Sequence, residues 1–197
     1  MKKQSFSLFL LSLLIFSAGY GCRALLGTRT ITETDIATSV TVTRKRFFFN
    51  RNLEKKTPFV SLTKTVTRRT GPDNNTSYTF YDVLVLDQES FTVRNKIFVI
   101  IDGEVFPVTV RQERPESVTT TSTNTKTLST SDSSSVTVVT GYSQSHLKYF
   151  KLEYPLSPGI IERMKSAGEI LFRYYAGPNM MTVRFRGKYL GQLKEMI

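Results

Sequence analysis

Cysteine and histidine, the residues that most often hold metals or serve in catalysis, are nearly missing from this sequence of 197 residues. It contains one cysteine, Cys22, and one histidine, His146. A single cysteine cannot form an internal disulfide, and zinc sites need several Cys or His ligands. The Gly-x-Ser-x-Gly, phosphate-loop and HExxH patterns are missing as well. The sequence therefore gives no positive reason to predict an enzyme, a metal site or a cofactor.

Acidic residues are also few, 16 against 27 lysines and arginines. Asp82, Asp102 and Glu104 are near one another in the sequence, but Asp102 belongs to a turn signal, where such residues have a backbone role. A paired general acid and base is therefore not indicated. An enzyme of unfamiliar motif is the third hypothesis for this chain, and it requires these three residues and His146 to meet in one pocket.

No apolar stretch reaches the roughly 20 residues that a membrane-spanning helix needs. The longest one, residues 6–18, follows Lys2 and Lys3 and is interrupted only by three serines. Its length of about thirteen residues is typical of the apolar part of an export signal, which has roughly 7–15. We therefore predict a signal peptide over residues 1–21, whose removal from 197 residues leaves 176.

The small residues at the end of this stretch lead directly into the only cysteine, in the segment Ala18-Gly19-Tyr20-Gly21-Cys22. This segment resembles the lipobox of bacterial lipoproteins. The resemblance implies a diacylglyceryl group on the Cys22 thiol, removal of the preceding peptide and acylation of the new amino terminus. It also implies a place in the bacterial cell envelope, on the outer membrane or surface rather than the inner membrane. The alternative is ordinary signal-peptide cleavage after Gly19 or Gly21, which releases a secreted protein.

Several acyl chains hold a protein durably to a membrane, because each buried CH2 group contributes about 0.8 kcal/mol. The full chain has a net charge of +11, and removing Lys2 and Lys3 leaves +9. Such a balance favours anionic partners, namely acidic polysaccharide, lipid headgroups or an acidic protein surface. Export makes nucleic acid the least favoured of the anionic partners.

The densest basic and aromatic cluster lies between residues 44 and 51. We predict Arg44, Lys45, Arg46 and Arg51 as the contacts for an anionic ligand, because cations beside aromatic rings suit anionic polymers and membrane interfaces. The competing interpretation, which we favour, is a core strand whose phenylalanines point inward.

Alternation of apolar and polar residues predicts a mostly antiparallel α+β fold with two short helices near the C-terminus. Asp102-Gly103 is the strongest hairpin signal, and Pro107 places the returning strand at an edge or an irregularity. A single domain over residues 39–197 would follow a lipidated N-terminus and tether over residues 22–38. The predicted strands cover residues 39–43, 57–67, 78–86, 96–101, 104–110, 147–154, 169–175 and 181–186, and the predicted helices 158–167 and 188–196.

Residues 117–135 stand apart, because fourteen of the nineteen are serine or threonine. A segment with so little to bury is expected to be a mobile loop, since burial cannot offset the entropy of ordering it. Its threonines equally suit a long projecting hairpin with residues 136–139 in the returning strand. Both alternatives stay open at this level.

Two function hypotheses follow. The first is a membrane-anchored, non-enzymatic envelope lipoprotein that acts as a binding or scaffolding module, with the membrane reached through acyl chains on Cys22. The second is a secreted or surface adhesin, or another ligand-binding module, that uses residues 117–135 as its contact surface.

Overall fold

The computed structural model describes residues 30–50, 58–87, 90–129 and 135–197. The predicted signal peptide over residues 1–21 and the predicted lipidation site Cys22 lie outside the described residues. Within the described ranges, the helices are too short or too polar to cross a membrane.

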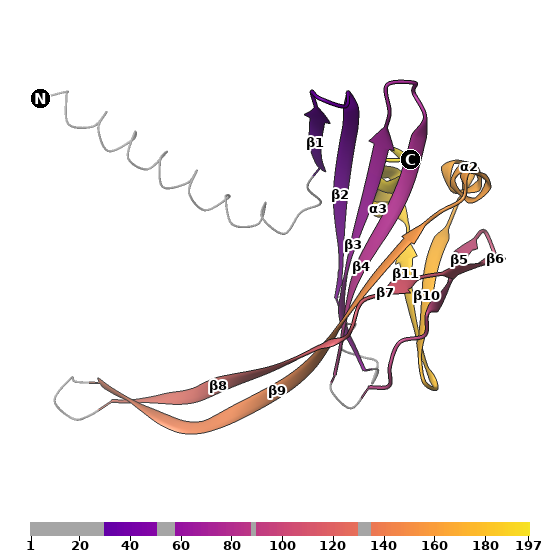
Figure 1. Ribbon diagram of the computed structural model, residues 1–197. Coiled ribbons are helices and arrows are strands. Elements are labelled where there is room, and N and C mark those ends of the chain that lie inside the picture. The colour runs from indigo at the N-terminus through magenta and orange to yellow at the C-terminus, as the bar shows by residue number, and fades with distance from the viewer. Residues whose placement is uncertain (1–29, 51–57, 88–89, 130–134) are drawn as a thin grey trace, which may run out of the picture.

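Seven of the described strands form one antiparallel sheet in the order β1-β2-β3-β4-β9-β7, with β8 paired to β9 (Figure 1). Strand β1 falls within the segment expected to be a tether and pairs with β2 along its whole length. The strands are β1 (Thr30–Asp35), β2 (Val40–Asn50), β3 (Phe59–Thr70), β4 (Thr76–Asp87), β7 (Arg111–Gln112), β8 (Glu116–Ser129) and β9 (Ser135–Pro155).

The other four described strands form a second antiparallel sheet in the order β11-β10-β5-β6. Its strands are β5 (Lys96–Ile101), β6 (Glu104–Thr109), β10 (Ile170–Ala176) and β11 (Asn179–Phe185). Asp102 and Gly103 have φ angles of 48° and 90°, the left-handed values of a two-residue hairpin turn. Pro107, which cannot donate to a neighbour, lies in the edge strand β6 as expected.

Two helices in the described part of the chain accompany the sheets, α2 (Pro158–Ser166) and α3 (Gly187–Lys194). Pro158 occupies the first turn of α2, where a missing N–H costs nothing. The predicted fold class, mostly antiparallel α+β with two short helices, is confirmed, and α3 lies near the C-terminus.

The core lies between the two sheets, because alternate residues of each strand point inward. Phe80 of the larger sheet faces Phe172 of the smaller one, with ring centroids 5.9 Å apart. Ile161 and Met164 of α2 and Leu193 of α3 close the same core. The larger sheet leaves its other face to solvent, and β8 and β9 continue beyond the core as a ribbon of two strands (Figure 1).

Candidate functional site

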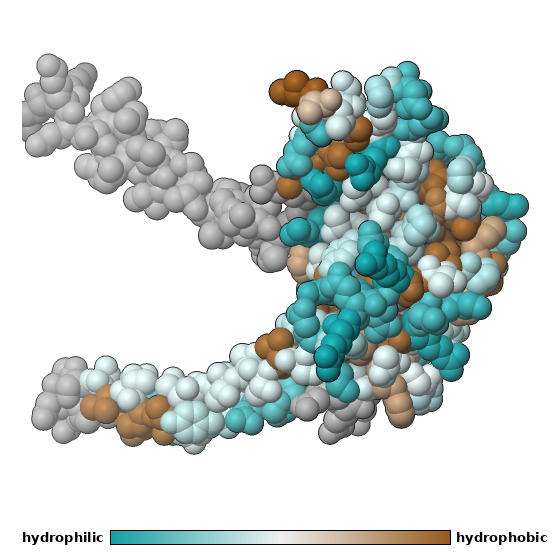
Figure 2. Space-filling model, in the orientation of Figure 1, coloured by the Kyte–Doolittle hydropathy of each residue, from teal (hydrophilic) through white to brown (hydrophobic). Residues whose placement is uncertain are grey.

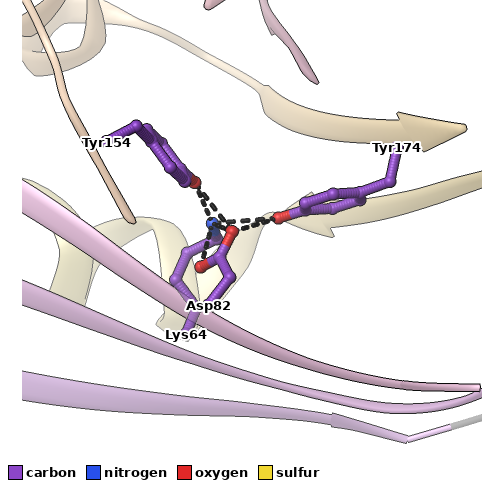
Figure 3. Close-up of polar contacts among 4 residues, drawn as sticks. All are labelled: Lys64, Asp82, Tyr154 and Tyr174. Atoms are coloured by element: carbon purple, nitrogen blue, oxygen red, sulfur yellow. Dashed lines mark hydrogen bonds and ion pairs between the residues drawn. The ribbon is translucent and has the colours of Figure 1, made fainter. Parts of the chain in front are cut away.

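Four polar side chains meet in the core between the sheets (Figure 3). Lys64 of β3 lies directly opposite Asp82 of β4, and its Nζ is 2.7 Å from both carboxylate oxygens. Tyr154 of β9 and Tyr174 of β10 accept hydrogen bonds from the same Nζ, at 2.6 and 3.0 Å. Their hydroxyls donate to Asp82 Oδ2 at 2.8 and 2.6 Å. We refer to these four residues as the Lys64 cluster.

The electrostatics of the Lys64 cluster follow from complete burial, since all four side chains are 0% exposed. Burial lowers the pKa of Lys64 to about 8, against the opposing effect of the Asp82 charge. Burial, then the negative charge of Asp82, raises the pKa of Tyr154 and Tyr174 well above 10.0, so both phenols stay protonated and donate. The ammonium also lies 3.8 Å from the centroid of the Phe172 ring, a favourable contact for a cation.

Lysine, aspartate and tyrosine can all exchange protons, but a ligand must reach them first. All four side chains are 0% exposed to solvent, and of them only Tyr174 borders the cavity at the end of β2 that is described below. The hydrogen bonds of the Lys64 cluster instead connect three strands of the larger sheet to β10 of the smaller one. The arrangement therefore fixes how the two sheets stack.

Sequence reasoning did not find Lys64, although a signal was present. Lys64 occupies the inward place between Leu62 and Val66, on a face that is otherwise apolar. Asp82 interrupts the inward face of the next strand in the same way. Opposite charges on the apolar faces of two consecutive strands are the pattern that identifies such a pair, because neither charge is buried alone.

The structure does not bring together the groups that the enzyme hypothesis required. Asp82 is in the core, whereas Asp102 accepts hydrogen bonds from two backbone N–H groups just after α2. Glu104 pairs with Arg163 on the surface, and His146 lies opposite Thr119 at the base of the ribbon formed by β8 and β9. In the described ranges, no three or more His, Cys, Asp or Glu side chains are grouped so as to hold a metal.

The predicted contacts for an anionic ligand are distributed over two faces of β2. Arg44 and Arg46 point outward and are exposed, and Arg44 pairs with Glu33 at 2.8 Å. Lys45 points inward, is 7% exposed and binds Glu195 at 3.1 Å. Arg51 lies outside the described residues. Of the predicted set, the structure therefore brings only Arg44 and Arg46 to a common exposed face.

The phenylalanines that follow these cations behave largely as a core strand. Phe47 is 0% exposed and meets Phe185 and Tyr189 edge to face, at centroid distances of 5.0 and 5.9 Å. Phe49 contacts the same two rings. Phe48 alone points outward. The interpretation of this stretch as a core strand is confirmed.

A cavity of about 540 Å³ lies between the end of β2 and β11. Apolar side chains, among them Phe49, Phe59 and Met181, meet Arg184 and Arg186 in its wall. Asn50 also lines the cavity, and the residues that follow it, 51–57, lie outside the described part of the chain.

The most unusual feature of the molecule is the ribbon itself. Pairing of β4 with β9 ends at Asp87 and Leu147, and beyond that point β9 pairs only with β8. Residues 119–129 and 135–146 therefore leave the body as a two-stranded projection, which we call the arm, with Ser117 and Val118 at its base (Figure 1). The sequence left a mobile loop and a projecting hairpin open for residues 117–135, and the described residues of this segment form the projecting hairpin.

The arm exposes both of its faces to solvent. Five threonines of β8 at alternate positions share one face, and polar pairs such as Ser122 and Ser143, 2.6 Å apart, cross the ribbon. Apolar side chains are exposed too, and Figure 2 shows a group of them near the far end of the arm. Leu128 (44%), Val136 (51%) and Val139 (53%) belong to the outer part of the arm, Tyr142 (72%) to its middle and Val118 (41%) to its base.

Comparison with known proteins gives no further guide to this site: no family model, curated protein or solved structure matches the chain.

Proposed function

We propose that this protein is a membrane-anchored, non-enzymatic lipoprotein of the bacterial envelope, and that it works as a binding or scaffolding module through its arm. Acyl chains on Cys22 would provide the anchor. The domain of two stacked sheets would then hold the arm in a fixed direction, because β9 runs without a break from the core into the arm.

The observation that carries this proposal is the arm. A two-stranded ribbon has little stability of its own in water, since three or more strands or a packed face are needed. The arm nonetheless leaves the body and keeps valine, leucine and tyrosine side chains exposed. A contact surface explains both facts, because a partner would cover the apolar side chains and the free strand edges.

Arg44 and Arg46 supply a second, weaker contact for an anionic polysaccharide or lipid headgroup. Both are exposed on β2, and charged contacts between exposed groups weaken with salt because the screening length is about 10 Å at 0.1 M. Binding of anionic vesicles should therefore fall as salt rises, and a double R44Q/R46Q variant should bind less. Vesicle binding that is the same at low and high salt, and the same for the wild type and the R44Q/R46Q variant, would rule out this contact.

The anchor is tested by the Cys22→Ser variant together with the intact mass of the wild-type protein. We expect wild type to fractionate with membranes and to weigh several hundred daltons more than the processed peptide, because acyl chains add tens of CH2 groups. The variant should be released or remain uncleaved. A wild-type mass equal to that of the bare peptide would favour the secreted adhesin instead.

The arm is tested by placing a photo-crosslinking amino acid at Thr121, at Val139 and, as a control, at Thr34 of β1. All three positions are exposed, but only the first two lie on the arm. We expect discrete crosslinked products from the two arm positions in intact cells and little from Thr34. If neither arm position gives crosslinked products although the protein is present at normal levels, the assignment of the arm as the contact surface is overturned.

A further inference from the structure

The free sheet edges of this protein are protected to very different degrees. An edge strand presents unpaired N–H and C=O groups that can pair with another chain, and charges, prolines or short length normally prevent this. Strand β1 has six residues and carries Glu33 and Asp35, and β6 has six and carries Glu104 and Pro107. Strand β11 has seven residues and carries Arg184.

Strand β8 has none of this protection along most of its length. It has fourteen residues, and among the described residues its second edge has no strand partner. The nine residues from Ser117 to Thr125 include no charge and no proline. Charged side chains occur only at Glu116 and Lys126, one on each side of this uncharged stretch. The pairing of β8 with β9 shifts register only between Asn124 and Thr125. The long and uncharged edge is therefore a ready template for another strand.

We propose that the partner of this edge is the β8 strand of a second copy of the chain, paired antiparallel about a twofold axis at Thr121. The inference rests on the proposed function, because it names the partner of the arm. In such a pairing the numbers of opposed residues sum to 242, so Glu116 of each copy lies opposite Lys126 of the other. In a twofold interface each contact occurs twice, so this register brings opposite charges together at both ends of the uncharged stretch.

Two further properties of the arm favour a copy of itself over an unrelated partner. The uncharged stretch would oppose serine and threonine with serine and threonine, and Val118 with Asn124. Hydroxyl pairs of this kind stabilise neighbouring strands. The arm already contains such pairs, for example Thr127 with Thr137 at 3.2 Å. The arm also projects away from the basic body (Figure 1), so in this antiparallel pairing the two bodies would lie at opposite ends of the paired strands, which limits their repulsion.

Crosslinking through introduced cysteines tests both the partner and the register. Opposed Cα atoms of an antiparallel pair are about 4.5–5.5 Å apart, within the disulfide range. Under mild oxidation the full-length T121C protein should form a disulfide dimer with itself. Proteins with T119C or T123C alone should do so at least about tenfold less, whereas a mixture of the two should crosslink, because 119 and 123 also sum to 242. The wild type, with Cys22 alone, and T34C on β1 are controls.

Charge reversal gives an independent measurement, the dimer dissociation constant from sedimentation of the full-length protein in density-matched detergent. K126E places two acidic residues opposite each other at both ends and should weaken the dimer by about tenfold or more. E116K/K126E/K151E restores opposite charges across the interface and keeps an ion pair within each copy, where Glu116 binds Lys151, so it should recover most of the affinity. A monomeric wild type, a T121C yield no higher than T34C, or failure of the triple variant to recover would each overturn the inference. Arm crosslinks in cells to a different envelope component would also overturn it, while leaving the proposed function in place.

Discussion

Substitution of Asp82 by asparagine replaces a single side-chain oxygen by an amide nitrogen, yet it should strongly destabilise the fold. Lys64 Nζ is 2.7 Å from both oxygens of Asp82, and both side chains are 0% exposed. Removing one partner leaves an ammonium buried without its counter-charge, which costs about 3–5 kcal/mol. That is a large share of the roughly 5–15 kcal/mol by which a domain of this kind is stable.

Replacing the whole cluster by apolar residues should have a much smaller effect. The quadruple variant K64M/D82V/Y154F/Y174F removes the charges and the hydroxyls that bind them, so no buried polar group is left without a partner. Such replacements are often neutral or stabilising, because a buried ion pair pays a desolvation cost close to its Coulombic gain. We therefore expect the quadruple variant to lie within about 1–2 kcal/mol of wild type and to be more stable than D82N.

Urea unfolding followed by far-ultraviolet circular dichroism measures these differences, since the chain has no tryptophan. Glu33→Gln is the control, because it breaks an ion pair with Arg44 whose side chains are 64% and 46% exposed. Exposed pairs contribute about 0–1 kcal/mol, so this variant should be nearly unchanged. A D82N protein within about 1 kcal/mol of wild type would refute the reasoning, since Lys64 would then have a partner other than Asp82.

Three other consequences concern pH, the aromatic core and one turn. Burial lowers the pKa of Lys64 to about 8 from its ordinary 10.5. Between these two pH values the unfolded chain binds more protons than the folded protein does. The unfolding free energy should therefore rise with pH in this range. Above about pH 10 the unfolding free energy should fall, because the buried tyrosines keep their protons whereas tyrosines of the unfolded chain lose them. Urea unfolding across this pH range measures both the rise and the fall. The K64M/D82V variant should lack the rise. Phe47→Ala should cost about 3–5 kcal/mol and Phe48→Ala less than about 1 kcal/mol by the same unfolding assay, because only Phe47 is fully buried. Gly177→Ala should destabilise the fold by at least about 1 kcal/mol and lower the melting temperature, because Gly177 has φ +56° and an added Cβ would meet the Phe91 ring. An unchanged melting temperature would contradict this turn geometry.

Local signals account for most of the fold that could be predicted from the sequence. Asp102-Gly103 identified a hairpin because few residue pairs tolerate two positive φ angles, and Pro158 and the apolar spacing after it identified α2. The inward position of Phe47 followed from alternation along β2. Signals of this kind depend on neighbours in the sequence and need no knowledge of which strands pair.

Long-range features were not accessible in the same way. The Lys64 cluster needs Tyr174, which is 110 residues from Lys64, and nothing near either residue indicates that their strands face each other across two sheets. The pairing of β1 with β2 was missed because Thr30–Asp35 is polar apart from Ile31, so no apolar alternation identifies it as a strand. For residues 117–135, composition alone could not choose between a loop and a hairpin, since threonine favours strands but supplies little to bury.

Hydrogen exchange on the arm tests the central claim most directly. The outward amides between Ser117 and Thr125 have no strand partner in a single copy, so they should exchange rapidly when the purified protein is dilute. In native membranes, where a partner would cover this edge, we predict that the same amides become protected while the amides of β1 do not change. Equally fast exchange of the arm in both preparations would contradict its assignment as a contact surface.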